Sequence, residues 1–246
     1  MSNCLNLVKI FAAIIFLCFF SSQGFAYAGA TKGSYFQIDA VHLRSSNRLS
    51  ISQEYKDYDT NVAAACDGYP KCYLGNEKPN AVGSGYGLNY KYAFSGEKTL
   101  VDPLKWLFIA PAIFYEKVNS IGTGKEYGNK VIINRRYGAK LDFGYDFDYG
   151  ISPYLTTGIS VLGYNVKVHD TSGSFVANKS GNDYGAFYGA GLAYSPFDKF
   201  SFVLEYNQQS NTLKSHVVGD YTSTGVPYGK VYATVRVFKF GVAYHF

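Results

Sequence analysis

VYATVRVFKFGVAYHF (Val231–Phe246) is the stretch that decides the fold. Every second residue from Phe238 onward is large and apolar, whereas the positions between them hold Lys, Gly, Ala and His. A period of two predicts a β-strand with two different faces, and this pair of faces is typical of a strand with lipid outside and a polar lumen inside. Because a spanning strand cannot leave its backbone unpaired in hydrocarbon, more such strands must precede it. Arg236 falls in the outward phase, so it lies at the outer interface or the strand bulges near Val237.

The composition favours strands over helices. The 246 residues include 24 Tyr, 19 Phe and 26 Gly, but only one Trp and one Met. Tyr, Phe and Gly are mediocre or poor helix formers, and such an excess suits short twisted strands with aromatic girdles. No long helical domain is expected.

Residues 1–28 have the pattern of a cleaved secretory signal peptide. Lys9 precedes an apolar run from Ile10 to Phe20, and Ala26-Tyr27-Ala28 forms a small-residue cleavage site. The apolar run is shorter than the roughly 20 residues that a transmembrane helix needs. We expect the mature chain to begin at Gly29, with residues 29–246 forming one domain.

Export bears on the two cysteines that remain, Cys66 and Cys72, because an oxidising compartment favours a disulfide between them. Two cysteines without a nearby histidine cannot complete a structural zinc site. The formal net charge of +5 is too mild to indicate a partner. Mixed charges in residues 46–80 argue against nucleic-acid binding, which requires clustered cations.

Seven earlier segments are predicted as strands, and all but residues 106–117, which are apolar on both faces and contain Pro111, alternate in the same way as the C-terminal strand. They are residues 35–40, 82–94, 106–117, 136–147, 154–168, 185–194 and 200–209. In residues 154–168 the outward phase of Leu155 and Ile159 changes near Leu162, which a bulge or emergence from the membrane would explain. Long polar connections alternate with short turns, and a sandwich gives no reason for that rhythm. The sequence therefore predicts an all-β, eight-stranded antiparallel up-and-down transmembrane barrel with extracellular loops at about 46–80, 118–134, 169–183 and 210–230.

Four acids and four bases fall in the inward phase of these strands. An ionic network that fills the narrow lumen is the main interpretation, and a small selective pore or binding cavity is the alternative. Antiparallel pairing is expected to bring Asp39, Glu205 and Lys239 to one depth. The predicted network consists of Asp39, Lys91, Glu116, Arg136, Lys140, Asp142, Glu205 and Lys239.

Catalytic chemistry has little support in the sequence. His42 is followed by Ser45 and Ser46, but one histidine with hydroxyls at a strand end is a weak signal, and no hydrolase elbow, phosphate-binding loop or metal pair stands out. We expect no catalytic or metal site and no cofactor. A lipid A-modifying enzyme is the most distant alternative.

The signal, the eight strands and the ending FKFGVAYHF together resemble the small outer-membrane β-barrel families, in particular the opacity-type porin and major surface antigen group of Gram-negative bacteria. This resemblance implies an outer-membrane location and contact with outer-membrane lipid. It also implies a non-catalytic surface antigen or adhesin-like protein whose loops are candidates to contact a host-cell or extracellular protein, with a small porin as the alternative. In such families the ending is similar to the signal read by the barrel assembly machinery, which here would be Phe238, Phe240, Val242, Tyr244 and Phe246.

Overall fold

The computed structural model describes residues 33–55, 71–95, 106–125, 128–147, 150–169, 175–216 and 225–246. Within these ranges no helix is long and apolar enough to cross a membrane. The predicted signal peptide and Cys66 lie outside the described residues. The strands are β1 (Gly33–Tyr55), β2 (Lys71–Glu77), β3 (Ala81–Ser95), β4 (Leu107–Thr123), β5 (Lys130–Tyr145), β6 (Ile151–His169), β7 (Phe175–Phe197), β8 (Phe200–His216) and β9 (Gly225–His245).

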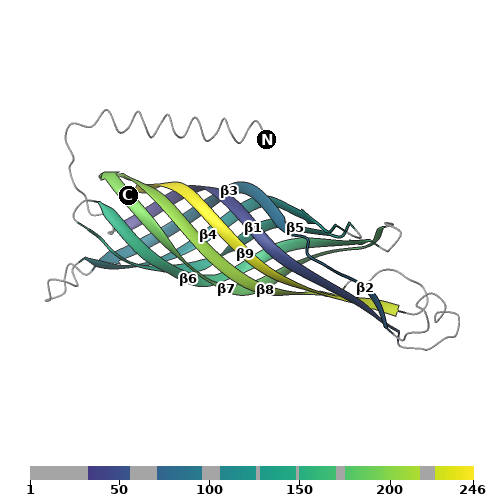
Figure 1. The fold of residues 1–246 in the computed structure, drawn as a ribbon. Helices are drawn as coiled ribbons and strands as arrows, with labels where there is room; N and C mark the ends of the chain where they lie inside the picture. The colour runs from purple at the N-terminus through teal and green to yellow at the C-terminus, as the bar shows by residue number, and fades with distance from the viewer. Residues whose placement is uncertain are drawn as a thin grey trace, which may run out of the picture.

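Eight of the strands close into a barrel (Figure 1). Strands β3 to β9 pair in sequence order, β1 pairs with β3, and β9 returns to pair with β1. The closing ladder runs from Tyr35 opposite His245 to Tyr55 opposite Gly225, and every pairing is antiparallel. The predicted eight-stranded antiparallel barrel is confirmed.

Strand β2 continues the line of β3 rather than adding a ninth stave. Ser45 pairs with Ala81 of β3 and Leu49 pairs with Glu77 of β2, so one register with β1 runs across the break at residues 78–80. The Asn47 side chain donates a 2.7 Å hydrogen bond to the Pro79 carbonyl and bridges that break.

Strands therefore extend into all four stretches that the sequence predicts as loops. Strand β1 reaches Tyr55, β4 reaches Thr123 and β5 begins at Lys130. Likewise β6 and β7 reach into residues 169–183, and β8 and β9 into residues 210–230. The predicted boundaries are wrong because polar outward residues in these stretches look like loop composition, although their backbones are paired.

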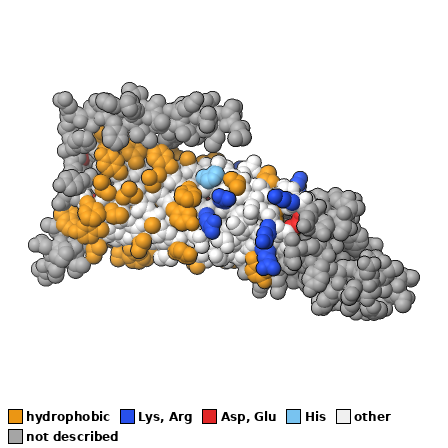
Figure 2. Space-filling view, in the orientation of Figure 1, with side chains coloured by type: hydrophobic (Ala, Val, Ile, Leu, Met, Phe, Trp, Pro, Cys, Tyr) orange, Lys and Arg blue, Asp and Glu red, His pale blue; other side chains and the backbone are white. Residues whose placement is uncertain are grey.

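The wall has two halves that differ in which face is apolar. In the half nearer the C-terminus, here the apolar-belted half, the outward side chains are aromatic or aliphatic and exposed (Figure 2). Examples are Ile38, Tyr90, Ile113, Leu155, Ile159, Leu204 and Phe238. The other half, here the extension, is the part of the wall nearer to β2. On each strand it begins just beyond one boundary residue and runs away from the C-terminus. The boundary residues are His42, Ser84, Tyr115, Arg136, Val161, Tyr184, Gln208 and Phe238.

The extension has an aliphatic interior. Its inward apolar side chains form one buried cluster that starts at Val41 just below its boundary, beside buried polar residues such as Ser45, Asn47 and Ser120. Its outward positions are mainly Arg, Lys, Asn and Ser. This is the arrangement of a water-soluble barrel, in which burial of apolar surface stabilises the interior. The cluster includes Val41, Leu43, Leu49, Val118, Val131, Ile133, Leu162, Tyr164, Val166, Val231, Val235 and Val237.

This inversion corrects the reading of β6. The predicted change of phase near Leu162 is wrong, because even-numbered residues from Tyr154 to Val166 stay inward and Leu162 is completely buried. The strand leaves the apolar belt at this level, and its interior becomes apolar. The irregularity lies in the neighbouring strand, where the β5–β6 register shifts between Ile133 and Arg135. Strand β9 shows no shift near Val237, so Arg236 is exposed without a bulge.

Candidate functional site

The eight charged residues of the predicted network all lie inside the barrel. Each side chain comes from an inward position of its strand, and none of the eight residues is more than 8% exposed. They occupy the middle of the lumen, between an apolar layer near the C-terminal end and the aliphatic interior of the extension. Four acids and four cations leave the group without net formal charge.

Seven of these side chains form one continuous series of alternating charges. Lys91 contacts Asp142 at 3.3 Å, and Asp142 contacts Lys140 at 3.3 Å. Lys140 in turn contacts Glu205, which accepts from Lys239 at 2.7 Å. Lys239 reaches Glu116 at 3.1 Å, and Glu116 accepts from Arg136 at 3.1 Å. The series joins strands β3, β4, β5, β8 and β9, so it crosses the lumen from wall to wall.

The Arg136 guanidinium is completely buried at one end of this series. Its Nε donates to Gln209 Oε1 at 3.0 Å and lies 3.2 Å from Ser160 Oγ. The guanidinium carbon lies 4.4 Å from the centre of the Phe187 ring and 5.0 Å from that of Phe114, at distances typical of cation–π contacts. A buried cation is tolerated when it is paired and hydrogen-bonded, and Nε and Nη1 meet that condition, whereas Nη2 has no hydrogen-bond partner among the described residues.

Lys239 forms ion pairs with two acids, and one of them is not the acid that the sequence suggests. The structure brings Lys239 and Glu205 together, but Glu116 takes the place expected for Asp39. The Asp39 carboxylate instead accepts a 2.5 Å hydrogen bond from Gln37 on the same strand. Strand tilt in a closed barrel offsets residues across the lumen, so strand pairing alone does not give such partners.

Sequence reasoning also missed neutral residues that complete the network. The Tyr154 hydroxyl donates to Glu205 at 3.0 Å, and Asn207 donates to the other Glu205 oxygen at 3.1 Å. Gln209 accepts from Arg136 and from Ser160. Their inward phase was the available signal, because a polar residue that faces a filled interior needs a partner.

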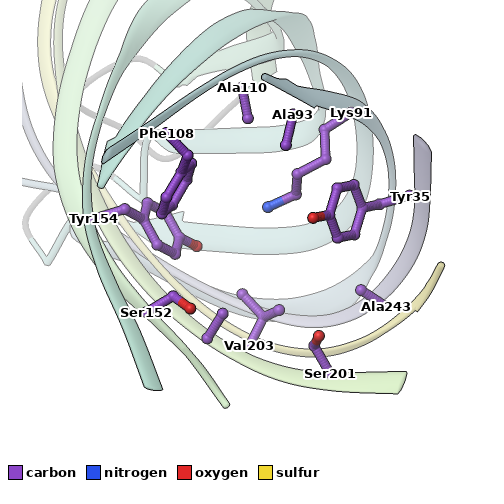
Figure 3. Close-up of a pocket in the computed structure, with 11 residues that line it drawn as sticks. Tyr35, Lys91, Ala93, Phe108, Ala110, Ser152, Tyr154, Ser201, Val203 and Ala243 are labelled. Carbon is purple, nitrogen blue, oxygen red and sulfur yellow. The ribbon is translucent and has the colours of Figure 1, made fainter. Parts of the chain in front are cut away.

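The C-terminal end of the lumen is closed by small and aromatic side chains (Figure 3). Tyr35, Phe108 and Tyr154 project inward from different strands, and the Lys91 amine lies among them, 5.3 Å from the centre of the Tyr154 ring. The cavity between them has a volume of about 20 Å³. That is space for about one water molecule, so a hydrated solute does not fit.

The structure separates the residues of the weak catalytic hypothesis. His42 points outward, where its Nδ1 lies 3.2 Å from Ser84 Oγ, whereas Ser45 is buried inside. His245 lies near the C-terminal mouth with its Nε2 2.5 Å from Ser201 Oγ. Of the predicted disulfide, Cys72 belongs to β2 and its side chain is not described, and Cys66 is outside the described residues.

The proposed assembly residues form a row on the outer surface of β9. Phe238 is 55% exposed and Phe246 is 76% exposed, so the aromatic face is available to lipid. Tyr244 stacks edge-to-face with both Phe200 and Phe246 at a centre distance of 5.2 Å. Phe240 and Val242 occupy the same face between them and are half-buried.

Comparisons with known proteins give a family. The family model described as outer membrane protein beta-barrel domain matches residues 12–246. Solved structures with a similar fold include OprG of Pseudomonas aeruginosa (16% identity, 89% of this chain and 98% of that one, TM-score 0.48). They also include the outer membrane protease OmpT of Escherichia coli (9% identity, 90% of this chain and 99% of that one, TM-score 0.47). A third is Neisserial surface protein A (13% identity, 88% of this chain and 99% of that one, TM-score 0.44). No curated protein sequence matches the chain. The family match covers nearly the whole sequence, and the chain therefore belongs to the outer membrane protein β-barrel domain family, whose members lie in the outer membrane.

Proposed function

We propose that this protein is a non-catalytic outer-membrane surface protein, antigen-like or adhesin-like, which presents the connections at the far end of its extension to the outside. The observation that carries the proposal is the filled interior. The series of ion pairs from Lys91 to Arg136 crosses the lumen, with apolar layers on both sides of it.

A filled interior argues against the porin alternative. A conducting pore needs a continuous wet path, and eight strands leave little more than the space that side chains occupy. Opening one here requires Lys239 to leave both Glu116 and Glu205 in a water-poor interior. Breaking a buried pair of charges costs about 3–5 kcal/mol, so an open state would be rare.

The extension supports display as the function of the outer end. From His42 to Tyr55, β1 stays paired with β9 along its whole length. At about 3.3 Å per residue and a tilt of about 40°, this part of the strand rises roughly 30 Å beyond the belt. A paired wall of this height would hold the ends of β1 and β9, at Tyr55 and Gly225, clear of the lipid surface, where a partner can reach the connections that follow them.

Two measurements test the proposal. Single-channel recording of the purified, folded protein in planar bilayers should show no channel events. Intact cells that carry an epitope tag inserted at residues 170–174 should bind the tag antibody without permeabilisation. Steady conductance would favour the porin alternative, and a tag that is reached only after permeabilisation would contradict surface display.

The lipid A-modifying alternative has its own readout. In the non-catalytic interpretation, cells with and without the gene give the same lipid A mass spectrum. A gene-dependent mass change that persists in a variant with His42→Ala would place an active site elsewhere in the chain, and one that disappears would place it on the outer surface at His42.

A further inference from the structure

Among the side chains that the structure describes, the exposed charges of the extension all have one sign. In the part of the extension whose side chains are described, the exposed charged residues are Arg44, Arg48, Lys78, Lys117, Lys125, Lys130, Arg135 and Arg236. Of the described acids in the extension, Glu77 is buried and Asp183 is half-buried, where its carboxylate accepts a hydrogen bond from Asn211. On the face that Figure 2 shows, several basic side chains and one small acidic surface lie beside the apolar belt. Surface cations in soluble proteins are usually interspersed with acids, so the described part of this surface favours a negatively charged ligand.

Four of these cations stand directly opposite each other in pairs. Arg44 of β1 is the register partner of Arg236 of β9, and Lys117 of β4 is the partner of Arg135 of β5. Outward side chains at paired positions have Cβ atoms about 5 Å apart, and like charges there are destabilising. A third pair among the described residues, Lys130 of β5 with the half-buried Lys167 of β6, lies farther from the apolar belt. Such pairs oppose folding unless an anion binds between the charges.

Both pairs lie at the upper edge of the apolar belt. The outward pair directly below Lys117 and Arg135 is Tyr115 with Tyr137, which are 40% and 38% exposed. Directly below Arg44 and Arg236 lies the pair His42 and Phe238. Aromatic rings mark the level of the membrane–water interface in outer-membrane barrels. The cation pairs therefore lie at the depth of the lipid headgroups in the outer leaflet.

The wall around Arg135 is shaped to hold its long side chain in place. Gly163 is the residue of β6 opposite Arg135, and a Cβ atom there would come within 2.6 Å of Arg135 Cγ. Because residue 163 has no side chain, Arg135 lies across β6, and its Nη2 is 3.4 Å from Asn182 Oδ1 on β7. Arg236 is held similarly, with its Nε 3.3 Å from Gln208 Oε1 on β8. Each guanidinium is thus positioned by a neutral amide, and no ion pair with an acid among the described residues compensates its charge.

We propose that these two pairs, Lys117 with Arg135 and Arg44 with Arg236, are binding sites for phosphate groups on the headgroups of outer-leaflet lipid. Arginine presents a planar fork of N–H donors that matches phosphate oxygens, and lysine adds a compact positive charge. A phosphate between the members of a pair contacts two cations and removes their repulsion. The aromatic belt below accommodates the acyl chains of the same lipid.

The test uses the whole folded protein in a zwitterionic detergent, with diphosphorylated lipid A as the probe. In the site variant, Lys117→Ser is combined with Arg135→Ser. In the control variant, Lys78→Ser is combined with Lys125→Ser, which removes two exposed cations away from the paired positions. Lipid A bound per protein is counted by native mass spectrometry, and folding is verified from the difference in gel migration between unheated and heated samples.

Because the Arg44 and Arg236 pair remains, we expect the site variant to bind about one lipid A molecule fewer per protein than the wild type, and the control to bind as many as the wild type. Thermal unfolding gives a second readout. Without lipid A the site variant should unfold at the same temperature as the wild type or higher, since a repulsion is gone, whereas saturating lipid A should raise its unfolding temperature by less than that of the wild type and the control.

Two further arms identify the source of the phosphate. Chemically dephosphorylated lipid A should bind all three proteins equally and weakly. Inorganic phosphate at the same concentration as lipid A should displace little of it, because the acyl chains contribute to binding. Equal loss in the site and control variants, undiminished binding of dephosphorylated lipid, or full displacement by inorganic phosphate would each overturn the assignment.

Discussion

Leu155 and Leu162 lie on the same strand, β6, and they face opposite sides of the wall. Leu155 is 67% exposed on the outside of the apolar-belted half, whereas Leu162 is 0% exposed inside the extension. Charged residues show the reverse distribution. Lys140 is buried in the interior of the belted half, whereas Lys117 is exposed on the outer surface of the extension. Alternation with a period of two thus fixes which residues share a face, while the solvent on each side decides which face must be apolar.

The largest expected effect comes from breaking the charged interior of the belted half. Glu205→Ala removes the acid that Lys140 and Lys239 share and leaves buried positive charge unpaired. We expect a loss of about 3–5 kcal/mol in the free energy of unfolding, measured by reversible urea titration in detergent. Asp198→Ala in the exposed turn between β7 and β8 removes the same charge and should cost far less. Similar losses in the two variants would mean that the network does not stabilise the barrel.

The aliphatic interior of the extension is tested by the two leucines of β6. Leu162→Ala creates a cavity in a packed cluster, and we expect a loss of about 3 kcal/mol. Leu155→Ala makes the same chemical change on the outer surface, where detergent or lipid fills the space, so its effect should be much smaller. Equal effects would show that the extension lacks a packed interior, and the contrast between the halves would fail.

The outer surface provides the reverse comparison. Ile159→Arg places a cation on the lipid face of the belted half, where Ile159 is 69% exposed, and should cost about 2 kcal/mol in lipid bilayers. Ser46→Arg places the same side chain on the exposed outer surface of the extension and should be nearly neutral. Unfolding titrations in vesicles would distinguish the two sites, and a neutral Ile159→Arg would move the membrane boundary.

The smallest effect on stability is expected at the C-terminal residue. Phe246→Ala removes a side chain that is 76% exposed, so the loss of unfolding free energy in detergent should be under about 1 kcal/mol. If the C-terminal row serves as an assembly signal, the amount of folded protein in the outer membrane should fall much more than this stability change explains. Quantitative blotting of folded and unfolded bands in cells, beside purified protein, separates the two effects. Normal assembly would remove the signal hypothesis for Phe246.

The belted half could be predicted strand by strand. Its outward residues are aromatic, and the pattern of β3, β5 and β9 is that of lipid outside and polar lumen inside. The extension could not be predicted in this way because that pattern assumes that the apolar face points outward. With that assumption, the inward Leu162 looked like a change of phase, and the paired residues after Ser45 looked like a loop.

The site was predictable as a set of residues, although its pairs were not. Inward phase selected Lys239, Glu116 and Glu205 one strand at a time, and each selection needed only local alternation. Which acid meets which base depends on the tilt and stagger of the closed wall, which no single strand encodes. Glu116 reaches Lys239 across the lumen from β4, a strand that is not paired with β9.

The register shift in β5 has a consequence for how this gene tolerates insertions and deletions. Asn134 and Arg135 both face outward against the single residue Gly163, so Asn134 is the extra residue of a bulge. Loss of its codon would leave Ile133 facing inward and Arg135 facing outward, and β5 would pair regularly with β6, while the register shift that β5 makes with β4 at this level would grow from one residue to two. Loss of a codon at an alternating position such as Gly138 would turn part of the strand inside out. Natural length variation in this wall is therefore expected at residue 134 before any other position in the middle of β5.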